Sequence, residues 1–126
     1  CFMSKRQDFE LLCDIKEAIQ RISGYVSRIS HDRFIKDKKT QDAVIRNLEI
    51  IGEAVKILSV GLKRKHCDIP WKELAGLRDR LIHQYFGVNL DIVWKIIKQE
   101  LPELARQIEK IPVEGNKSNP KKNINK

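Results

Sequence analysis

The chain has few of the residues that break helices. Six glycines and four prolines occur among its 126 residues, which favours long helices over many short strands. Two of the prolines, Pro112 and Pro120, lie in the last fifteen residues. No apolar run approaches the roughly 18 residues that a membrane-spanning helix needs. We therefore expect a helical protein without a membrane segment.

Cysteine is scarce too. Cys1, Cys13 and Cys67 are odd in number and form no C-x-x-C pair, which is typical of the reducing cytoplasm rather than of a disulfide-linked secreted domain. Cys67 follows His66, but no second pair of candidate ligands has a spacing suited to a metal. We predict a cytoplasmic protein with no metal site and no cofactor.

Charge is abundant, and positive charge dominates. Charged residues make up 33% of the chain and the net charge is +8. Residues 112–126 hold four lysines against Glu114 and contribute +3, so +5 remains on the rest. This balance is compatible with a polyanionic partner but is weak evidence alone. The last residues have little to bury, so we predict one helical domain over residues 4–111 and a disordered basic tail over 112–126.

Apolar residues recur at steps of three and four along four stretches, which predicts four main helices. The first should cover residues 8–30, with a loop over 31–39 that holds at most a short turn at 33–35. The second should start at Thr40 as N-cap and stop at Gly61. A basic loop over residues 63–66 should follow it.

The third helix should cover residues 71–86, with a joint at Gly76 as one option. The last should begin after the N-cap Asn89 and be kinked or split by Pro102, which lacks an N–H. No stretch alternates with the period of a strand. The predicted fold is therefore all-α, an antiparallel up-and-down bundle of four to five helices. Its long apolar stripes would also suit pairing between chains, so we expect a homodimer.

The segment from Leu77 to Phe86 is the most informative for chemistry. On a helix, Arg78 lies within about 60° of Leu81, Ile82 and Tyr85. This places Arg78 inside the apolar stripe, where a guanidinium needs an anion from the protein or a ligand. Arg80 should point away into solvent.

Asp79 lies four residues before His83, so its carboxylate could orient the imidazole of His83 for acid/base work. The alternative for His83 is a packing or capping role, which is the commoner fate of an isolated helical histidine. Trp71 and Trp94 fit the apolar stripes, and core packing is favoured over base stacking for both.

Arg78-x-x-x-x-His83-x-Tyr85 resembles the signature of the HepT-like toxins, within the HEPN superfamily of small helical ribonucleases. Residues 40–54, 69–78 and 85–90 resemble the family's other characteristic stretches, in the same order, so that the resemblance covers roughly residues 4–111. Asp79 fills the polar position that commonly follows the motif arginine.

The resemblance implies a dimer in which Arg78 and His83 of both protomers line one cleft and cleave RNA without a metal. It also implies a nucleotidyltransferase antitoxin that attaches AMP to Tyr85 and so silences the enzyme. Attack by the RNA 2′-OH needs a base and an acid on opposite sides of the phosphorus. Two facing His83 residues could meet that need, with Arg78 clamping the phosphate.

Two other readings stay open. The chain could be a non-catalytic helical dimer that acts as a binding or accessory subunit of a nucleotidyltransferase. It could also be a nucleotide-binding subunit that uses the lysines and arginine of residues 63–65. The basic runs at 36–39 and 63–65 and the lysine tail could steer RNA, although a solvated surface is the ordinary reading of such runs.

Overall fold

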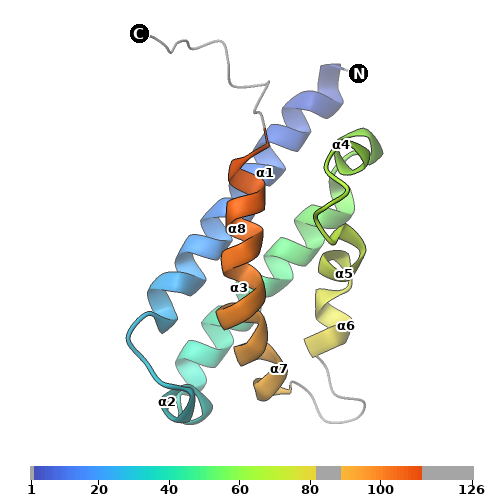
Figure 1. The fold of residues 1–126 in the computed structure, drawn as a ribbon. Helices are drawn as coiled ribbons and strands as arrows, with labels where there is room; N and C mark the ends of the chain where they lie inside the picture. Colours follow the sequence, from blue (N-terminus) through green and yellow to red (C-terminus); the bar gives the residue numbers. More distant parts are fainter. Residues whose placement is uncertain (1, 82–88, 112–126) are drawn as a thin grey trace, which may run out of the picture.

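The computed structural model describes residues 2–81 and 89–111, with side chains from Gln7 onward. Throughout these residues every regular element is helical, which confirms the all-α prediction. Four helical segments alternate in direction (Figure 1). They are α1 (Phe2–Val26), α3 (Lys38–Ile57), α5 (Trp71–Ala75) with α6 (Leu77–Leu81), and α7 (Leu90–Lys95) continued by η1 (Ile96–Glu100) and α8 (Leu101–Glu109). Two short helices, α2 (His31–Lys36) and α4 (Val60–Lys65), join consecutive segments at opposite ends of the bundle (Figure 1).

The apolar stripes of these segments meet in one core. In α1 the buried residues follow the predicted stripe, since Leu12, Ile15, Ile19, Ile22 and Val26 are all at most 8% exposed. Burying each such side chain contributes about 1.5–3 kcal/mol. Trp71 is buried as predicted, and Trp94 is partly buried against the core. No helix of the described ranges is long and apolar enough to cross a membrane.

The predicted boundaries of the first helix and the loop after it were wrong. Helix α1 starts before Asp8 and ends at Val26. Asp8 does not cap its own helix, because its carboxylate accepts hydrogen bonds from the backbone N–H and hydroxyl of Ser59, at 2.9 and 2.6 Å. The expected loop holds α2, which Ser30 caps by accepting the N–H of Arg33 and which buries Phe34.

The second predicted helix also differs at both ends. Asp37, not Thr40, is the N-cap of α3, because its carboxylate accepts the N–H of Thr40 at 3.1 Å. The hydroxyl of Thr40 also donates to Asp37, and these two bonds lower the pKa of the Asp37 carboxyl. Helix α3 ends at Ile57, and Ser59 then caps α4, so Gly61 and the expected basic loop lie largely within a helix.

Pro102 lies in the first turn of α8, where the last helical path changes type without a gap. The helical path runs from Leu90 to Glu109, and the turn before the proline widens into the π-helical segment η1. The N–H of Leu101 bonds the carbonyl of Ile96. A proline clashes with the carbonyl four residues before it, and a wider turn relieves that clash. As predicted, Asn89 caps the start of this path, accepting the N–H groups of Asp91 and Ile92.

Gly52 is where α3 comes closest to α5 and α6. A Cβ at this position would lie 3.3 Å from the carbonyl oxygen of Leu74 and 3.6 Å from the Cβ of Leu77. The neighbouring atom is backbone, so it cannot rotate away as a side chain could. Absence of a side chain at Gly52 therefore sets how near α6 lies to α3.

We predict that Gly52→Val lowers the free energy of unfolding by about 1–3 kcal/mol, the usual cost of overpacking a core. Gly24→Val is the matched control, because it is also helical and no atom lies within 4 Å of its added Cβ. Urea unfolding followed by circular dichroism measures both variants. Equal stability of the two valine variants would contradict the close approach.

Candidate functional site

The described part of helix α6 is the five residues Leu77–Leu81. Leu77 and Leu81, which are 0% and 2% exposed, hold it against the core. At about 100° per residue, Arg78 and Arg80 flank this buried face on opposite sides, and Asp79 lies on the far side. Arg78 and Asp79 are both exposed.

The prediction that Arg78 lies inside an apolar stripe was wrong. It relied on Ile82 and Tyr85, which lie outside the described residues, whereas Leu77 and Leu81 set the buried face of α6. With that face as reference, Arg78 falls to its edge and its side chain is exposed. An exposed guanidinium has no desolvation cost to offset, so it requires no partner from its own chain.

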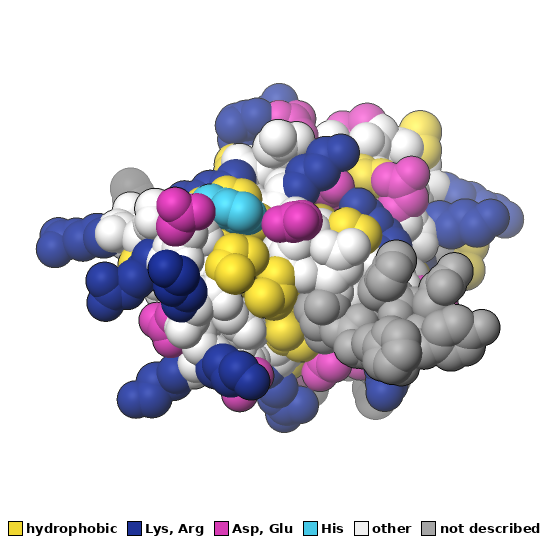
Figure 2. Space-filling model, turned by 90° about the horizontal axis from the view of Figure 1, so that it is seen from below, with side chains coloured by type: hydrophobic (Ala, Val, Ile, Leu, Met, Phe, Trp, Pro, Cys, Tyr) yellow, Lys and Arg dark blue, Asp and Glu magenta, His cyan; other side chains and the backbone are white. Residues whose placement is uncertain are grey.

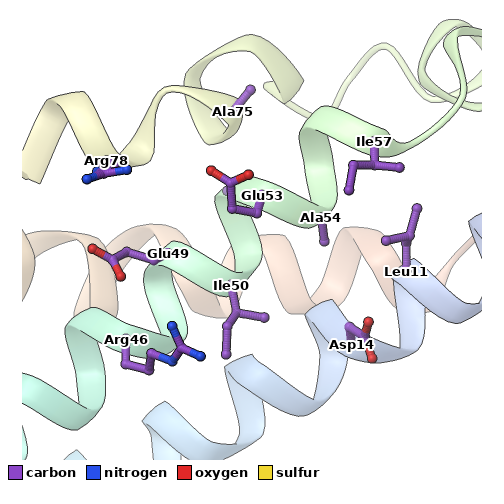
Figure 3. A pocket seen from close by; sticks show the side chains of 11 residues that line it. Leu11, Asp14, Arg46, Glu49, Ile50, Glu53, Ala54, Ile57, Ala75 and Arg78 are labelled. Carbon is purple, nitrogen blue, oxygen red and sulfur yellow. The ribbon is translucent and has the colours of Figure 1, made fainter.

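Arg78 lines a groove of about 430 Å³ between α3 and the helices on either side of it. Asp14 and Leu11 of α1 form one wall, while Ala75 of α5 and Arg78 form the other (Figure 3). The floor is one face of α3, formed by Arg46, Glu49, Ile50, Gly52, Glu53, Ala54 and Ile57. The groove thus combines apolar surface with charges of both signs.

The charges of the groove are only partly matched within the chain. Glu53 pairs with Lys56 at 3.3 Å. In the part of the chain that the structure describes, Arg78, Glu49 and the two outer charges Asp14 and Arg46 make no ion pair. The carboxylates of Glu49 and Glu53 point to the side of α3 where Arg78 lies (Figure 3).

The prediction for Arg80 was also wrong, since this arginine is not solvated on its own. Its Nη1 and Nη2 atoms donate to Oε1 and Oε2 of Glu100 at 3.0 and 2.8 Å. Both side chains are about one-third exposed, at 33% and 35%. These hydrogen bonds lower the pKa of the Glu100 carboxyl and raise the pKa of Arg80. The pair connects α6 to η1.

His83 and Tyr85 lie in the segment 82–88, outside the described residues. The predicted contact of Asp79 with His83 lies outside them as well. The two ends of this segment are close together, because the N–H of Asn89 donates to the carbonyl of Leu81 at 2.8 Å. Leu81 and Asn89, the described residues on either side of this segment, are therefore hydrogen-bonded to each other.

The end of the bundle beside α2 and α7 carries many lysines and arginines around a small apolar patch (Figure 2). Exposed basic residues on α2 and at the start of α3 include Arg33, Lys36, Lys38 and Lys39. His31 Nε2 lies 3.1 Å from Asp91 Oδ1, which connects α2 to the start of α7. This end thus carries exposed positive charge together with the exposed carboxylates of Asp32 and Asp91.

Metal-binding groups do not gather in residues 2–81 and 89–111: no set of three or more His, Cys, Asp and Glu side chains there could hold an ion. Cys13 and Cys67 are exposed free thiols.

None of the groove residues of α3 was singled out from the sequence. Arg46, Glu49, Glu53 and Ile57 follow steps of three and four, so a search for polar stripes would have placed them on one face. Glu100 gave no such signal, because its partner Arg80 lies twenty residues away in the chain.

Comparison with known proteins gives one consistent match. The family model described as Ribonuclease HepT-like matches residues 15–111. A protein of Thermococcus cleftensis named "Probable ribonuclease HepT" is 49% identical over 107 residues, 85% of this chain and 97% of its own length. Relatives named "Putative RNase" occur in Methanocaldococcus jannaschii, at 44% identity over 93% of this chain and 98% of the relative, and in Caldanaerobacter subterraneus, at 48% over 80% and 87%. No solved structure matches the chain.

Proposed function

Because the chain belongs to the HepT-like ribonuclease family, we propose that it is a metal-independent endoribonuclease that acts as a homodimer. In this proposal it is the toxin of a type VII-like toxin–antitoxin pair. The proposal rests on the position of Arg78, on its exposure and on its charge, which is unpaired within the described residues. This arginine is exposed on the wall of a groove, on a helix that the core holds in place, and its charge is not paired within the described chain.

The proposed reaction uses the RNA's own 2′-OH. His83 of one protomer removes the hydroxyl proton, and the oxygen attacks the neighbouring phosphorus. The bond from phosphorus to the 5′-oxygen breaks, and His83 of the other protomer protonates that oxygen. Arg78 neutralises the charge that builds on the phosphate oxygens. The products are a 2′,3′-cyclic phosphate and a 5′-hydroxyl.

The groove supports the pairing of two protomers. Ile57 is 51% exposed there, and Leu11 and Ile50 are only partly buried. A twofold interface brings the same surface of both copies together, so it requires a surface that complements itself. Arginines and carboxylates on one face meet this requirement, since each arginine can face a carboxylate of the second copy. The dimer would also bring two Arg78 side chains to one cleft.

Tyr85 is the proposed point of control. It follows His83 by two residues, in the segment that starts directly after α6. Transfer of AMP to its hydroxyl by a nucleotidyltransferase antitoxin adds a negative phosphate close to the histidine and the arginine. That phosphate would compete with RNA for the Arg78 guanidinium.

We predict that the wild-type protein cleaves bulk RNA in EDTA and leaves 2′,3′-cyclic phosphate ends. Arg78→Ala and His83→Ala should each lower the cleavage rate by about a hundredfold or more, the usual cost of losing a charge-stabilising or acid–base group. Arg106→Ala is the control, because Arg106 is an exposed arginine on α8. Gel analysis of labelled RNA measures the cleavage rate of the wild type and of the three variants.

Cleavage that needs added metal would contradict the metal-independent mechanism. If the wild type does not cleave RNA at all, the chain is instead a non-catalytic subunit of its nucleotidyltransferase.

We also predict that a cognate nucleotidyltransferase with ATP adds AMP to Tyr85, and that this stops cleavage. Tyr85→Phe should stay active after the same treatment, since it has no hydroxyl to modify. Tyr25→Phe is a suitable control, because Tyr25 is an exposed tyrosine on α1. Mass spectrometry of digested protein locates the added mass, and its presence on another residue would overturn the proposal.

A further inference from the structure

The two arginines that flank the buried face of α6 have different surroundings. Arg78 lies on the side of α3 and its groove, and its side chain is exposed. Arg80 lies on the side of η1, where both of its terminal nitrogens bond the two carboxylate oxygens of Glu100. A bidentate pair of this kind fixes direction as well as distance. Helix α6 is thus held between the core and one planar ion pair.

Backbone hydrogen bonds from the N–H of Arg80 to the carbonyl of Gly76 and from the N–H of Asn89 to the carbonyl of Leu81 connect α6 to its neighbours along the chain. Among its side chains, Leu77 and Leu81 contact the core from one side. Two leucines on one line allow a short helix to roll, because apolar contacts have no preferred direction. The bidentate ion pair between Arg80 and Glu100 lies on one flank of α6 and opposes that rotation. Any roll would move Arg78, on the opposite flank, toward or away from the groove.

The partner of Arg80 comes from an unusual part of the bundle. Glu100 is the last residue of the π-helical segment η1, directly before α8. Single π-helical turns inside α-helices are rare and often occur at functional sites. Here the widened turn, next to Pro102, presents a carboxylate to α6.

We propose that Arg80 and Glu100 are positioning residues for the nuclease reaction, acting by holding α6 so that Arg78 meets the phosphate. This role rests on the proposed function. Neither residue lines the groove, so neither is expected to touch RNA there. Their effect is on the geometry of Arg78, and a displacement of about 1 Å in a catalytic group can cost a hundredfold in rate.

The test measures cleavage by Arg80→Gln, Glu100→Gln and the exchanged pair Arg80→Glu with Glu100→Arg. We expect kcat to fall about tenfold or more in each single variant, with a smaller change in KM because other RNA contacts remain. The exchanged pair should regain most of the lost rate, since it restores an ion pair between the same helices. Assays run well below the unfolding temperature of each variant, which circular dichroism establishes.

The matched control is the pair Arg106 and Glu103, an exposed pair on α8. Glu103→Gln should leave kcat unchanged, because an exposed pair three residues apart on one helix orients nothing else. Unchanged kcat in Glu100→Gln would overturn the positioning role, and so would a loss that the exchanged pair does not restore. An inactive wild type would overturn the proposed function itself, and this role with it.

Discussion

The close packing of α6 against α3 is the constraint on which the rest of the site depends. Gly52 leaves no side chain between the two helices, and Leu77 lies next to the space that a Cβ there would fill. Because Leu77 and Leu81 both point into the core, Arg78 and Asp79 between them point away from it. Arg78 therefore faces the groove as a result of ordinary apolar packing. No buried charge is needed to place it.

Under the proposed function, the composition of the groove would link substrate binding to assembly. Its floor carries Glu49 and Glu53 on the same groove as Arg78, and carboxylates repel phosphate. In the proposed reaction, a phosphate would therefore approach the Arg78 guanidinium from the solvent side, away from the floor. The Glu49 carboxylate, which makes no ion pair within the described residues, would be available to an arginine of a second protomer.

Much of the fold could be predicted from the sequence, because steps of three and four in apolar residues report directly on helices. Boundaries were harder: Asp37, Ser30 and Ser59 cap helices that the apolar pattern alone does not delimit. The site residues Arg78 and Asp79 lie on α6 as expected, but Arg78 lies at the edge of the buried face and Arg80 is paired with Glu100. The expectation for Arg78 relied in part on Ile82 and Tyr85, which lie outside the described residues. The bond from Arg80 to Glu100 is tertiary, so periodicity could not predict it.

In the proposed function, one groove serves both as the dimer interface and as the cleavage site. Analytical ultracentrifugation and RNA cleavage on the same samples test it, with Ile57→Arg in the groove and Ile35→Arg on α2 as the matched exposed isoleucine. We expect the wild type and Ile35→Arg to sediment as active dimers, and Ile57→Arg to sediment as a folded monomer without activity. A monomeric Ile57→Arg that cleaves RNA at the wild-type rate would contradict it, and so would an active wild-type monomer.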